Sequence, residues 1–214
     1  MKRAAAFLLL CVCLLAGCGG GGKSDAETTA SEGGCTDATA QTHDDRKLAD
    51  EHLKLDAAKE YRLVFATNCG DFTVTLDQKA SPNATASLVS LAQRGFFDDT
   101  FFHRIVPGFV IQGGDPTGSG SVGPAYTTHD KVAAGASYVH GVVAMAKAGS
   151  EPAGTAGSQF FVVIGEDAAL PPEYAIVGKV TGGIDVVDRI GKLGDPATEQ
   201  PTRAVVIDHV DVES

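Results

Sequence analysis

The residues best suited to chemistry begin in one segment, Phe102–Asp115, which combines a cation, aromatic rings and a side-chain amide between glycine turns. Arg104 is the cation and Gln112 is the amide, and a second amide and ring follow at Gln159 and Phe161. A guanidinium stays protonated at any working pH and presents a planar array of donors, so one edge can be held while another acts. Such a group can stabilise a developing charge or lone pair by hydrogen bonding.

Other catalytic patterns are weak in this sequence. There is no convincing Ser/His/Asp arrangement for a hydrolase, and His129 and His140 lack the spacing of metal ligands. Gly118–Gly123 satisfies G-x-G-x-x-G, but Pro124 follows at once and no helical period comes after it. We therefore predict a surface loop there, with no dinucleotide, metal or cofactor. His103 would point opposite to Arg104 in a strand, so we expect a hydrogen-bonded structural group.

The remaining candidates each have a structural reading as well. Phe109, Val110 and Phe161 lie in β-rich runs, where such residues usually form core. Arg104 between apolar neighbours could form a structural ion pair, and Gln112 could simply begin a turn. Taken one at a time, these residues are compatible with either a structural or a functional role.

Three blocks of sequence resemble cyclophilins, the peptidyl-prolyl cis–trans isomerases. The blocks are Phe102–Asp115 (FHRIVPGFVIQGGD), Met145–Gly149 followed by Gly157–Phe161, and Leu170–Tyr174 leading into Val177–Val180. They occur in the family's order between about Leu55 and Val212. The resemblance implies a mainly β fold: a closed eight-stranded antiparallel barrel capped by two α-helices, with the active site in a groove on its outer face.

The resemblance also implies roles for individual residues. Arg104 falls on the catalytic arginine, and Gln112 falls on the glutamine that orders this arginine and the substrate. The proline-pocket walls correspond to Phe109, Val110, Phe161 and Leu170, the backbone-binding groove to Ala146, Lys147 and Gln159, and the pocket rim to Tyr174. The substrate would be a proline-containing segment of a protein.

The implied reaction is rotation about the peptide bond that precedes proline. Amide resonance gives this rotation a barrier of about 18–20 kcal/mol. Halfway through, the resonance is lost and the prolyl nitrogen regains a lone pair, so a guanidinium aimed at it stabilises the twisted state most. One such hydrogen bond contributes about 1.5–3 kcal/mol, or one to two decades in rate. A dry aromatic pocket that grips the proline ring must strengthen this contact.

Three positions depart from the family's usual pattern. Val110 replaces a common methionine and loses its reach, so the affinity for proline should fall. Ala169 stands where well-known members carry tryptophan, so we expect weak inhibition by cyclosporin. Tyr174 replaces the usual histidine but keeps an aromatic rim with a polar tip.

The elements that must position these residues follow from hydrophobic patterning. Strand-like runs occur at Arg62–Ala66, Phe72–Leu76, Phe101–Val106, Phe109–Ile111, Val142–Ala146, Phe160–Ile164, Ala175–Val180 and Ala204–Val212. Cys69–Asp71 supplies a hairpin turn between the first two runs. Helices are predicted from Ser81 to about Arg94 and over Ile184–Lys192. Periodicity alone does not distinguish a barrel from a sandwich.

The amino terminus is typical of an export signal. Lys2 and Arg3 precede an apolar stretch, Ala4–Gly17, which is too short to span a bilayer. The letters LAGC up to Cys18 resemble the lipobox of bacterial lipoproteins; the alternative is a plain signal peptide with an incidental cysteine. We predict a signal peptide at 1–17, a lipidated terminus and flexible tether at 18–54, and an isomerase domain at 55–214. The protein would be exported and membrane-anchored on the extracytoplasmic side of a bacterial cell.

Cysteine usage supports export. Cys11 and Cys13 would leave with the signal and Cys18 would carry lipid, which leaves Cys35 and Cys69. An even pair in an oxidising compartment favours a disulfide, and two free thiols are the alternative. A metal site is disfavoured because C-x-x-C spacing is missing.

The charge of the chain limits its partners. Lys plus Arg total 17 against 27 Asp plus Glu, a formal charge of −10 without a local basic patch, so nucleic-acid binding is not expected. Losing Lys2 and Arg3 with the signal lowers the charge to −12, so acyl chains and not a polybasic surface would hold the protein at a membrane. We expect a monomer.

Two functions compete. The first is an isomerase that speeds the folding of exported proteins, since X–Pro isomerisation takes tens to hundreds of seconds unaided. The second is a catalytically weak module or chaperone that binds proline-containing peptides. Intact Arg104 and Gln112 favour the first.

Overall fold

The computed structural model describes residues 34–51 and 53–214. The predicted signal peptide, Cys18 and the first part of the tether therefore lie outside the described residues. The described chain contains eleven strands and two helices: β1 (Arg62–Thr67), β2 (Phe72–Leu76), α1 (Pro82–Gln93), β3 (Thr100–Phe101), β4 (Arg104–Val106), β5 (Val110–Gly113), β6 (Thr128–His129), β7 (Val142–Met145), β8 (Thr155–Ala156), β9 (Phe160–Val163), β10 (Ile176–Gly182), α2 (Ile184–Gly191) and β11 (Val206–Glu213).

The hairpin of β1 and β2 forms because alternating apolar residues flank a tight turn. The register pairs Phe65 with Phe72, both buried, and their rings stack with centroids 4.7 Å apart. Gly70 adopts a φ of +107°, which only glycine reaches easily, and its amide donates to the carbonyl of Thr67 at 3.0 Å. The predicted hairpin is confirmed.

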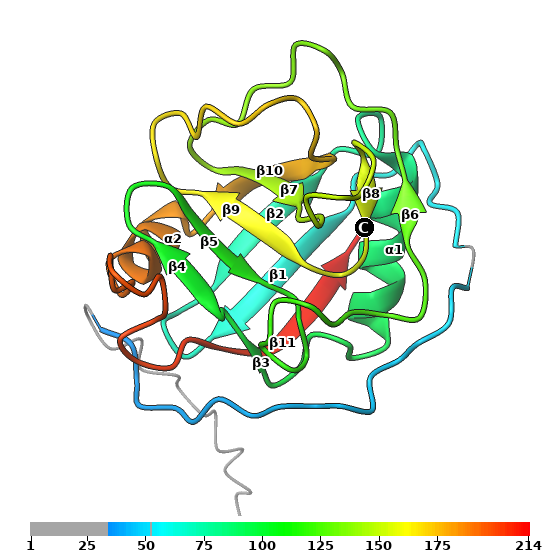
Figure 1. Cartoon of the computed structure of the whole chain (residues 1–214). Coiled ribbons are helices and arrows are strands. Elements are labelled where there is room, and N and C mark those ends of the chain that lie inside the picture. The colour runs from blue at the N-terminus through cyan, green and yellow to red at the C-terminus, as the bar shows by residue number, and fades with distance from the viewer. Residues whose placement is uncertain (1–33, 52) are drawn as a thin grey trace, which may run out of the picture. The chain divides into compact units, whose positions relative to one another are not determined.

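Within residues 34–51 and 53–214, nine strands form one antiparallel sheet in the order β3-β11-β1-β2-β10-β7-β9-β5-β4, and β6 pairs with β8 separately. The large sheet curls on itself (Figure 1). The predicted closed eight-stranded barrel is not confirmed, because the edge strands β3 and β4 do not pair with each other.

The seam between β3 and β4 has a local cause. The single strand predicted over Phe101–Val106 is interrupted at Phe102 and His103. The amide of Phe102 donates to the carbonyl of Val205 at 3.0 Å, whereas the amide of Ile105 donates to the carbonyl of Glu199 at 2.8 Å. The chain beside β3 and the chain in β4 thus both bond to the segment that leads into β11. No hydrogen-bond ladder therefore forms between β3 and β4.

The two helices lie on opposite sides of the curled sheet (Figure 1). Helix α1 begins with Pro82 at its first turn, and the carboxylate of Asp130 accepts hydrogen bonds from the amides of Asn83 (3.1 Å) and Ala84 (2.7 Å). These bonds satisfy donors that a helix N-terminus leaves unpaired. Helix α2 buries Val187 and Ile190. Both predicted helices are confirmed within one or two residues.

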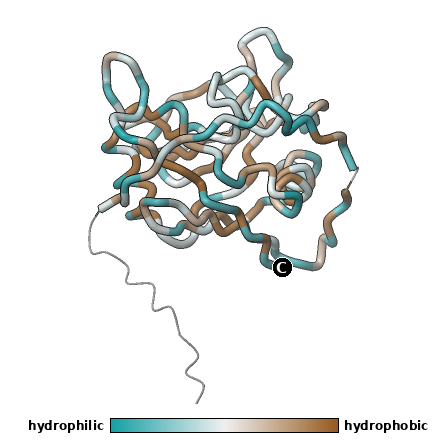
Figure 2. The backbone as a smooth tube through the Cα atoms, turned by 90° about the horizontal axis from the view of Figure 1, so that it is seen from below, coloured by the Kyte–Doolittle hydropathy of each residue, from teal (hydrophilic) through white to brown (hydrophobic). Residues whose placement is uncertain are grey.

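Strands β7 and β9 are apolar on both faces because each face is covered, and β5 follows the same pattern except at Gln112. The inward residues Ile111, Val143 and Val162 belong to the main core with Phe160. The outward residues form a second buried cluster, made of Val110, Tyr138, Val142, Ala144, Phe161 and Val163. Figure 2 shows hydrophobic stretches gathered inside this folded part and hydrophilic stretches in the peripheral loops.

The described residues 34–51 and 53–60, here called the strap, run along the surface of the domain (Figure 1). Cys35 forms a disulfide with Cys69 in the β1–β2 turn, the pairing expected from the sequence. The carbonyl of Leu48 accepts from the amide of Ala125 at 3.0 Å. The strap therefore belongs to the same compact unit as the strands.

Candidate active site

Sheet register places the predicted catalytic residues in one row. Arg104 on β4 lies opposite Gln112 on β5, Gln112 lies opposite Phe161 on β9, and Phe161 lies opposite Ala144 on β7. Directly paired residues in an antiparallel sheet project from the same face. The cation, the amide and the aromatic ring thus share the outer face of the sheet, opposite the main core.

The guanidinium of Arg104 is held by side chains on two of its edges. Its Nε donates to Glu199 Oε2 at 2.7 Å, and its Nη1 donates to Gln112 Oε1 at 3.4 Å. Its Cζ lies 5.9 Å from the centroid of the Phe109 ring, within range of a cation–π contact. The side chain is 33% exposed, so the cation remains accessible from solvent.

The apolar wall beside this cation consists of interlocking rings. Phe161 is only 5% exposed and meets Tyr174 edge to face at 5.5 Å and Tyr138 at 6.4 Å. Phe109, Leu170 and Tyr174 pack on the same cluster and are half-buried. The structure thereby brings together the residues assigned to the proline-pocket walls and rim, with Val110 fully covered beneath them.

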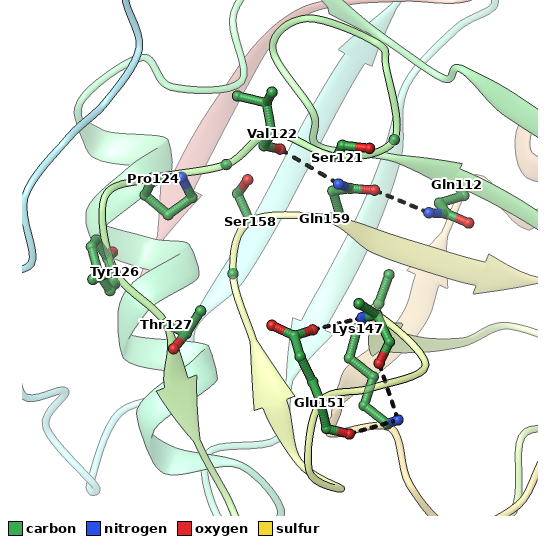
Figure 3. Close-up of a pocket in the computed structure, with 15 residues that line it drawn as sticks. Gln112, Ser121, Val122, Pro124, Tyr126, Thr127, Lys147, Glu151, Ser158 and Gln159 are labelled. Atoms are coloured by element: carbon green, nitrogen blue, oxygen red, sulfur yellow. Dashed lines mark hydrogen bonds between the residues drawn. The ribbon is translucent and has the colours of Figure 1, made fainter.

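A relay of amides runs from Gln112, the partner of Arg104, along one side of a neighbouring pocket; Figure 3 shows its two bonds beyond Gln112. Gln112 Nε2 donates to Gln159 Oε1 at 3.1 Å, and Gln159 Nε2 donates to the carbonyl of Val122 at 3.4 Å. The pocket has a volume of about 390 Å³, and its lining includes Gln112, Ala146, Lys147 and Gln159 together with the loop from Gly120 to Pro124. The residues assigned to the backbone-binding groove, Ala146, Lys147 and Gln159, therefore all line this pocket.

Lys147 lines that pocket without offering a free charge to it. Its side chain is 3% exposed, and its Nζ lies 3.0 Å from Glu173 Oε2. The same Nζ donates to the carbonyl of Glu151 at 3.1 Å and lies 5.5 Å from the centroid of the Tyr174 ring. The lysine thus fixes the loops that carry Glu151 and the rim tyrosine.

The loop after β5 is organised by one buried carboxylate. Asp115 is 0% exposed and accepts hydrogen bonds from the amides of Thr117 (2.7 Å), Ser121 (2.9 Å) and Val122 (3.1 Å). Burial raises the pKa of Asp115, but these bonds outweigh it, so the pKa lies below the ordinary value. The predicted loop at Gly118–Gly123 is confirmed, and its carbonyl at Val122 anchors the amide relay.

His103 departs from its predicted role. Both ring nitrogens are buried and neither has a hydrogen-bond partner among the described residues, so the expected hydrogen-bonded group is wrong. The chain leaves the strand conformation at His103, which turns the imidazole into the space under the Gly118–Gly123 loop. Burial lowers the pKa of His103, the charge of Asp115 raises it and that of Arg104 lowers it; the net shift is downward.

Glu199 is one residue of this site that sequence reasoning misses. It lies outside every block of the resemblance, 95 residues from Arg104 along the chain. No local pattern marks it, since a lone acid in a polar loop is common. Its φ of +59° is the structural signal, because a left-handed residue other than glycine is uncommon.

Two classes of site are not found in the described residues. No group of three or more His, Cys, Asp or Glu side chains is arranged to hold a metal ion there. No helix in residues 34–51 and 53–214 is long and apolar enough to cross a membrane.

Comparison with known proteins identifies the family that this chain resembles. Residues 62–212 match the family described as cyclophilin type peptidyl-prolyl cis-trans isomerase/CLD. A peptidyl-prolyl cis-trans isomerase of Arabidopsis thaliana is 36% identical over 145 residues, covering 66% of this chain and 87% of the relative. A probable peptidyl-prolyl cis-trans isomerase A of Mycobacterium leprae is 37% identical over 164 residues, covering 68% and 88%.

A solved structure has the same fold. The crystal structure of a cyclophilin-type isomerase of Cryptosporidium parvum, in the presence of the dipeptide Ala-Pro, superposes with a TM-score of 0.66 at 30% identity. The match covers 72% of this chain and 99% of that one. This chain therefore belongs to the cyclophilin-type peptidyl-prolyl cis-trans isomerase family and is an enzyme of that class.

Proposed function

We propose that this isomerase acts outside the cytoplasm of a bacterial cell, on X–Pro bonds of exported proteins, while lipids on Cys18 hold it at the membrane. The support is the lipobox-like sequence before Cys18 and the pairing of Cys35 with Cys69, which suits an oxidising compartment. Slow X–Pro isomerisation limits folding, so exported chains are suitable substrates.

We further propose that Arg104 is the catalytic residue. The observation that carries this assignment is the row Arg104–Gln112–Phe161. The row has the cation of Arg104 at one end and the aromatic wall around Phe161 at the other. A proline ring seated against Phe161 would bring its nitrogen within reach of the guanidinium. The relative from Cryptosporidium parvum was crystallised in the presence of a dipeptide that contains proline, which is consistent with such a seat.

The proposed reaction proceeds without breaking a bond. The wall of Phe109, Phe161 and Leu170 holds the proline ring while the preceding carbonyl rotates. In the twisted state the prolyl nitrogen becomes pyramidal and accepts a hydrogen bond from the guanidinium, which the planar states cannot do. The donor is already oriented by Gln112, so little reorganisation is needed at that moment.

The enzymatic test compares the wild type with Arg104→Ala in cis–trans exchange of a proline tetrapeptide followed by NMR. We expect kcat/KM to fall by one to two decades, since one charge-assisted hydrogen bond is lost. Arg104→Lys keeps the charge but not the planar fork, and it should recover only part of the rate. Exchange by Arg104→Ala at the wild-type rate would contradict the assignment, and uncatalysed exchange by the wild type would leave only a peptide-binding module.

The export test measures the mass of the mature amino terminus from membranes of a bacterial host. A diacylated or triacylated chain that begins at Cys18 supports the anchor. Cys18→Ser should release the protein from the membrane fraction without changing its isomerase rate. An unmodified chain that begins elsewhere would refute lipidation.

A further inference from the structure

Glu199 makes the shorter of the two side-chain hydrogen bonds to the guanidinium of Arg104. The distance from Arg104 Nε to Glu199 Oε2 is 2.7 Å, shorter than the 3.4 Å from Nη1 to Gln112. The two side chains are 33% and 46% exposed, so solvent screens the pair and its contribution to folding is small. A contribution to folding stability therefore does not explain this ion pair.

The backbone at Glu199 is held in an unfavourable conformation. Its φ of +59° is left-handed, a region that costs a residue other than glycine about 1–3 kcal/mol. Such strain persists only where the surroundings determine the conformation, and it gathers at functional sites. Within residues 34–51 and 53–214, only Asp99 and Ala169 share a positive φ without being glycine.

Hydrogen bonds within the turn Asp195–Glu199 and one from β4 fix this backbone. The amide of Glu199 donates to the carbonyl of Asp195 at 2.7 Å, and its carbonyl accepts from the amide of Ile105 at 2.8 Å. The side chain of Asp195 accepts from the amides of Ala197 (2.8 Å) and Thr198 (3.0 Å). The bond to Ile105 ties the turn directly to β4, next to Arg104.

The consequence for Arg104 is that two of its three nitrogens are occupied. Glu199 takes Nε and Gln112 takes Nη1, and in the described part of the chain no hydrogen bond engages Nη2. A guanidinium held at both positions loses its rotational freedom before substrate arrives, so this entropy is not lost in the transition state. Three of the five N–H bonds of the guanidinium remain free in the described residues, one on Nη1 and two on Nη2.

We propose that Glu199 is a positioning residue for the isomerase reaction: its strained turn holds the Nε edge of Arg104 so that Nη2 is presented to the prolyl nitrogen. This inference rests on the proposed catalytic role of Arg104. It predicts that Glu199 acts on kcat more than on KM, because the aromatic wall that binds the proline ring does not involve this carboxylate.

The deciding variant is Glu199→Gly. It removes the carboxylate, and glycine adopts the left-handed backbone conformation without strain. We expect kcat to fall about tenfold, the equivalent of one charge-assisted hydrogen bond, with KM unchanged. The Tm should not fall, because relief of strain offsets the added freedom of the unfolded chain. Glu199→Gln keeps an acceptor of the same length and should restore most of kcat.

A spectroscopic signal separates positioning from a structural role. The Arg104 Nε–H resonance should be protected from solvent exchange in the wild type and lose that protection in Glu199→Gly. Asp37→Asn is the matched control, because Asp37 pairs with Arg203 at the same 2.7 Å away from the row. This control should leave kcat and the Arg104 resonance unchanged.

The outcomes are distinguishable from those of the proposed function. A wild-type kcat in Glu199→Gly overturns the positioning role even where Arg104→Ala is inactive. A parallel loss of Tm, kcat and KM also overturns it, in favour of a structural role. In the Arg104→Ala background Glu199→Gly should have no further effect on kcat. If Arg104→Ala itself keeps the wild-type rate, the catalytic assignment fails first.

Discussion

The hydroxyl of Tyr138 bonds both backbone polar atoms of Tyr174. It donates to the carbonyl oxygen at 2.8 Å and accepts from the amide nitrogen at 3.0 Å. Tyr138 is 1% exposed, and its ring also meets that of Tyr174 at 6.0 Å. One buried phenol thus sets the position of Tyr174, which the resemblance assigns to the rim of the proline pocket, although the sequence around Tyr138 carries no feature of the family's motifs.

Tyr138→Phe should weaken both the fold and substrate binding. The change leaves a half-buried amide and carbonyl of Tyr174 without partners, which costs about 1–3 kcal/mol. The looser rim should raise KM for a proline peptide more than it lowers kcat. Urea unfolding and steady-state exchange measure the two effects. Tyr61→Phe is the control, since that hydroxyl accepts only one bond, from Asp56 at 3.2 Å in an exposed position. Equal effects of the two variants would refute the role of Tyr138.

Asp115→Asn should destabilise the loop that carries the amide relay. The carboxylate accepts several amide hydrogen bonds at a fully buried site, so we expect a loss of about 2–4 kcal/mol at pH 7. Because the folded-state pKa of Asp115 is depressed, its stabilisation is present above the unfolded value of 3.8 and is lost as pH falls through the folded pKa. The gap between variant and wild type in urea unfolding should therefore shrink at acid pH. A gap that is constant from pH 7 to pH 3 would contradict this account.

His103 should make the domain less stable in mild acid. Its folded pKa is lowered, chiefly by burial, so below the unfolded value of 6.5 the unfolded chain binds more protons than the folded one. Stability should fall as pH drops from 6.5 toward the folded pKa. His103→Gln, which cannot be protonated, should remove this part of the pH dependence. Parallel stability curves for the two proteins between pH 7 and pH 5 would show that the imidazole is not the cause.

Breaking the Cys35–Cys69 disulfide should lower stability by about 4 kcal/mol, the chain-entropy value for a closed loop of this length. The measurement is urea unfolding with and without dithiothreitol, with Cys35→Ser/Cys69→Ser as a variant that reductant does not affect. Alkylation followed by mass measurement checks the bond itself. An unchanged mass of alkylated protein after reduction would mean that the two thiols are not joined.

The sequence predicted the regular elements well because hydrophobic periodicity is strong where buried and exposed residues alternate along the chain. The strand Phe72–Leu76 and the helix at Ile184 are confirmed almost to the residue. The short pair Thr128–His129 and Thr155–Ala156 was missed, since two residues carry no period. The break at Phe102–His103 was missed for a different reason: both residues favour strands, and only competition for hydrogen bonds with the segment before β11 divides them.

The site could be predicted only where its residues lie in the family's motifs. Arg104, Gln112 and Phe161 fall in those blocks, and sheet register brings them together. Glu199 and Tyr138 act through contacts that cross 95 and 36 residues, so nothing local to either reveals its partner. His103 shows the opposite failure, because a residue inside a motif was expected to find a bond that the fold does not supply.

The disulfide also decides how a mechanical load enters the domain. Tension on the chain ahead of Cys35 passes through the sulfur bridge directly to Cys69, at the tip of the β1–β2 hairpin. Residues 36–68, which include most of the strap and β1, lie inside that covalent loop, so the bridge is a shorter path for the load than they are. If the amino terminus is anchored as proposed, a pull on it would reach the β1–β2 turn before it loads the hydrogen bond between Leu48 and Ala125, beside the loop that borders the pocket.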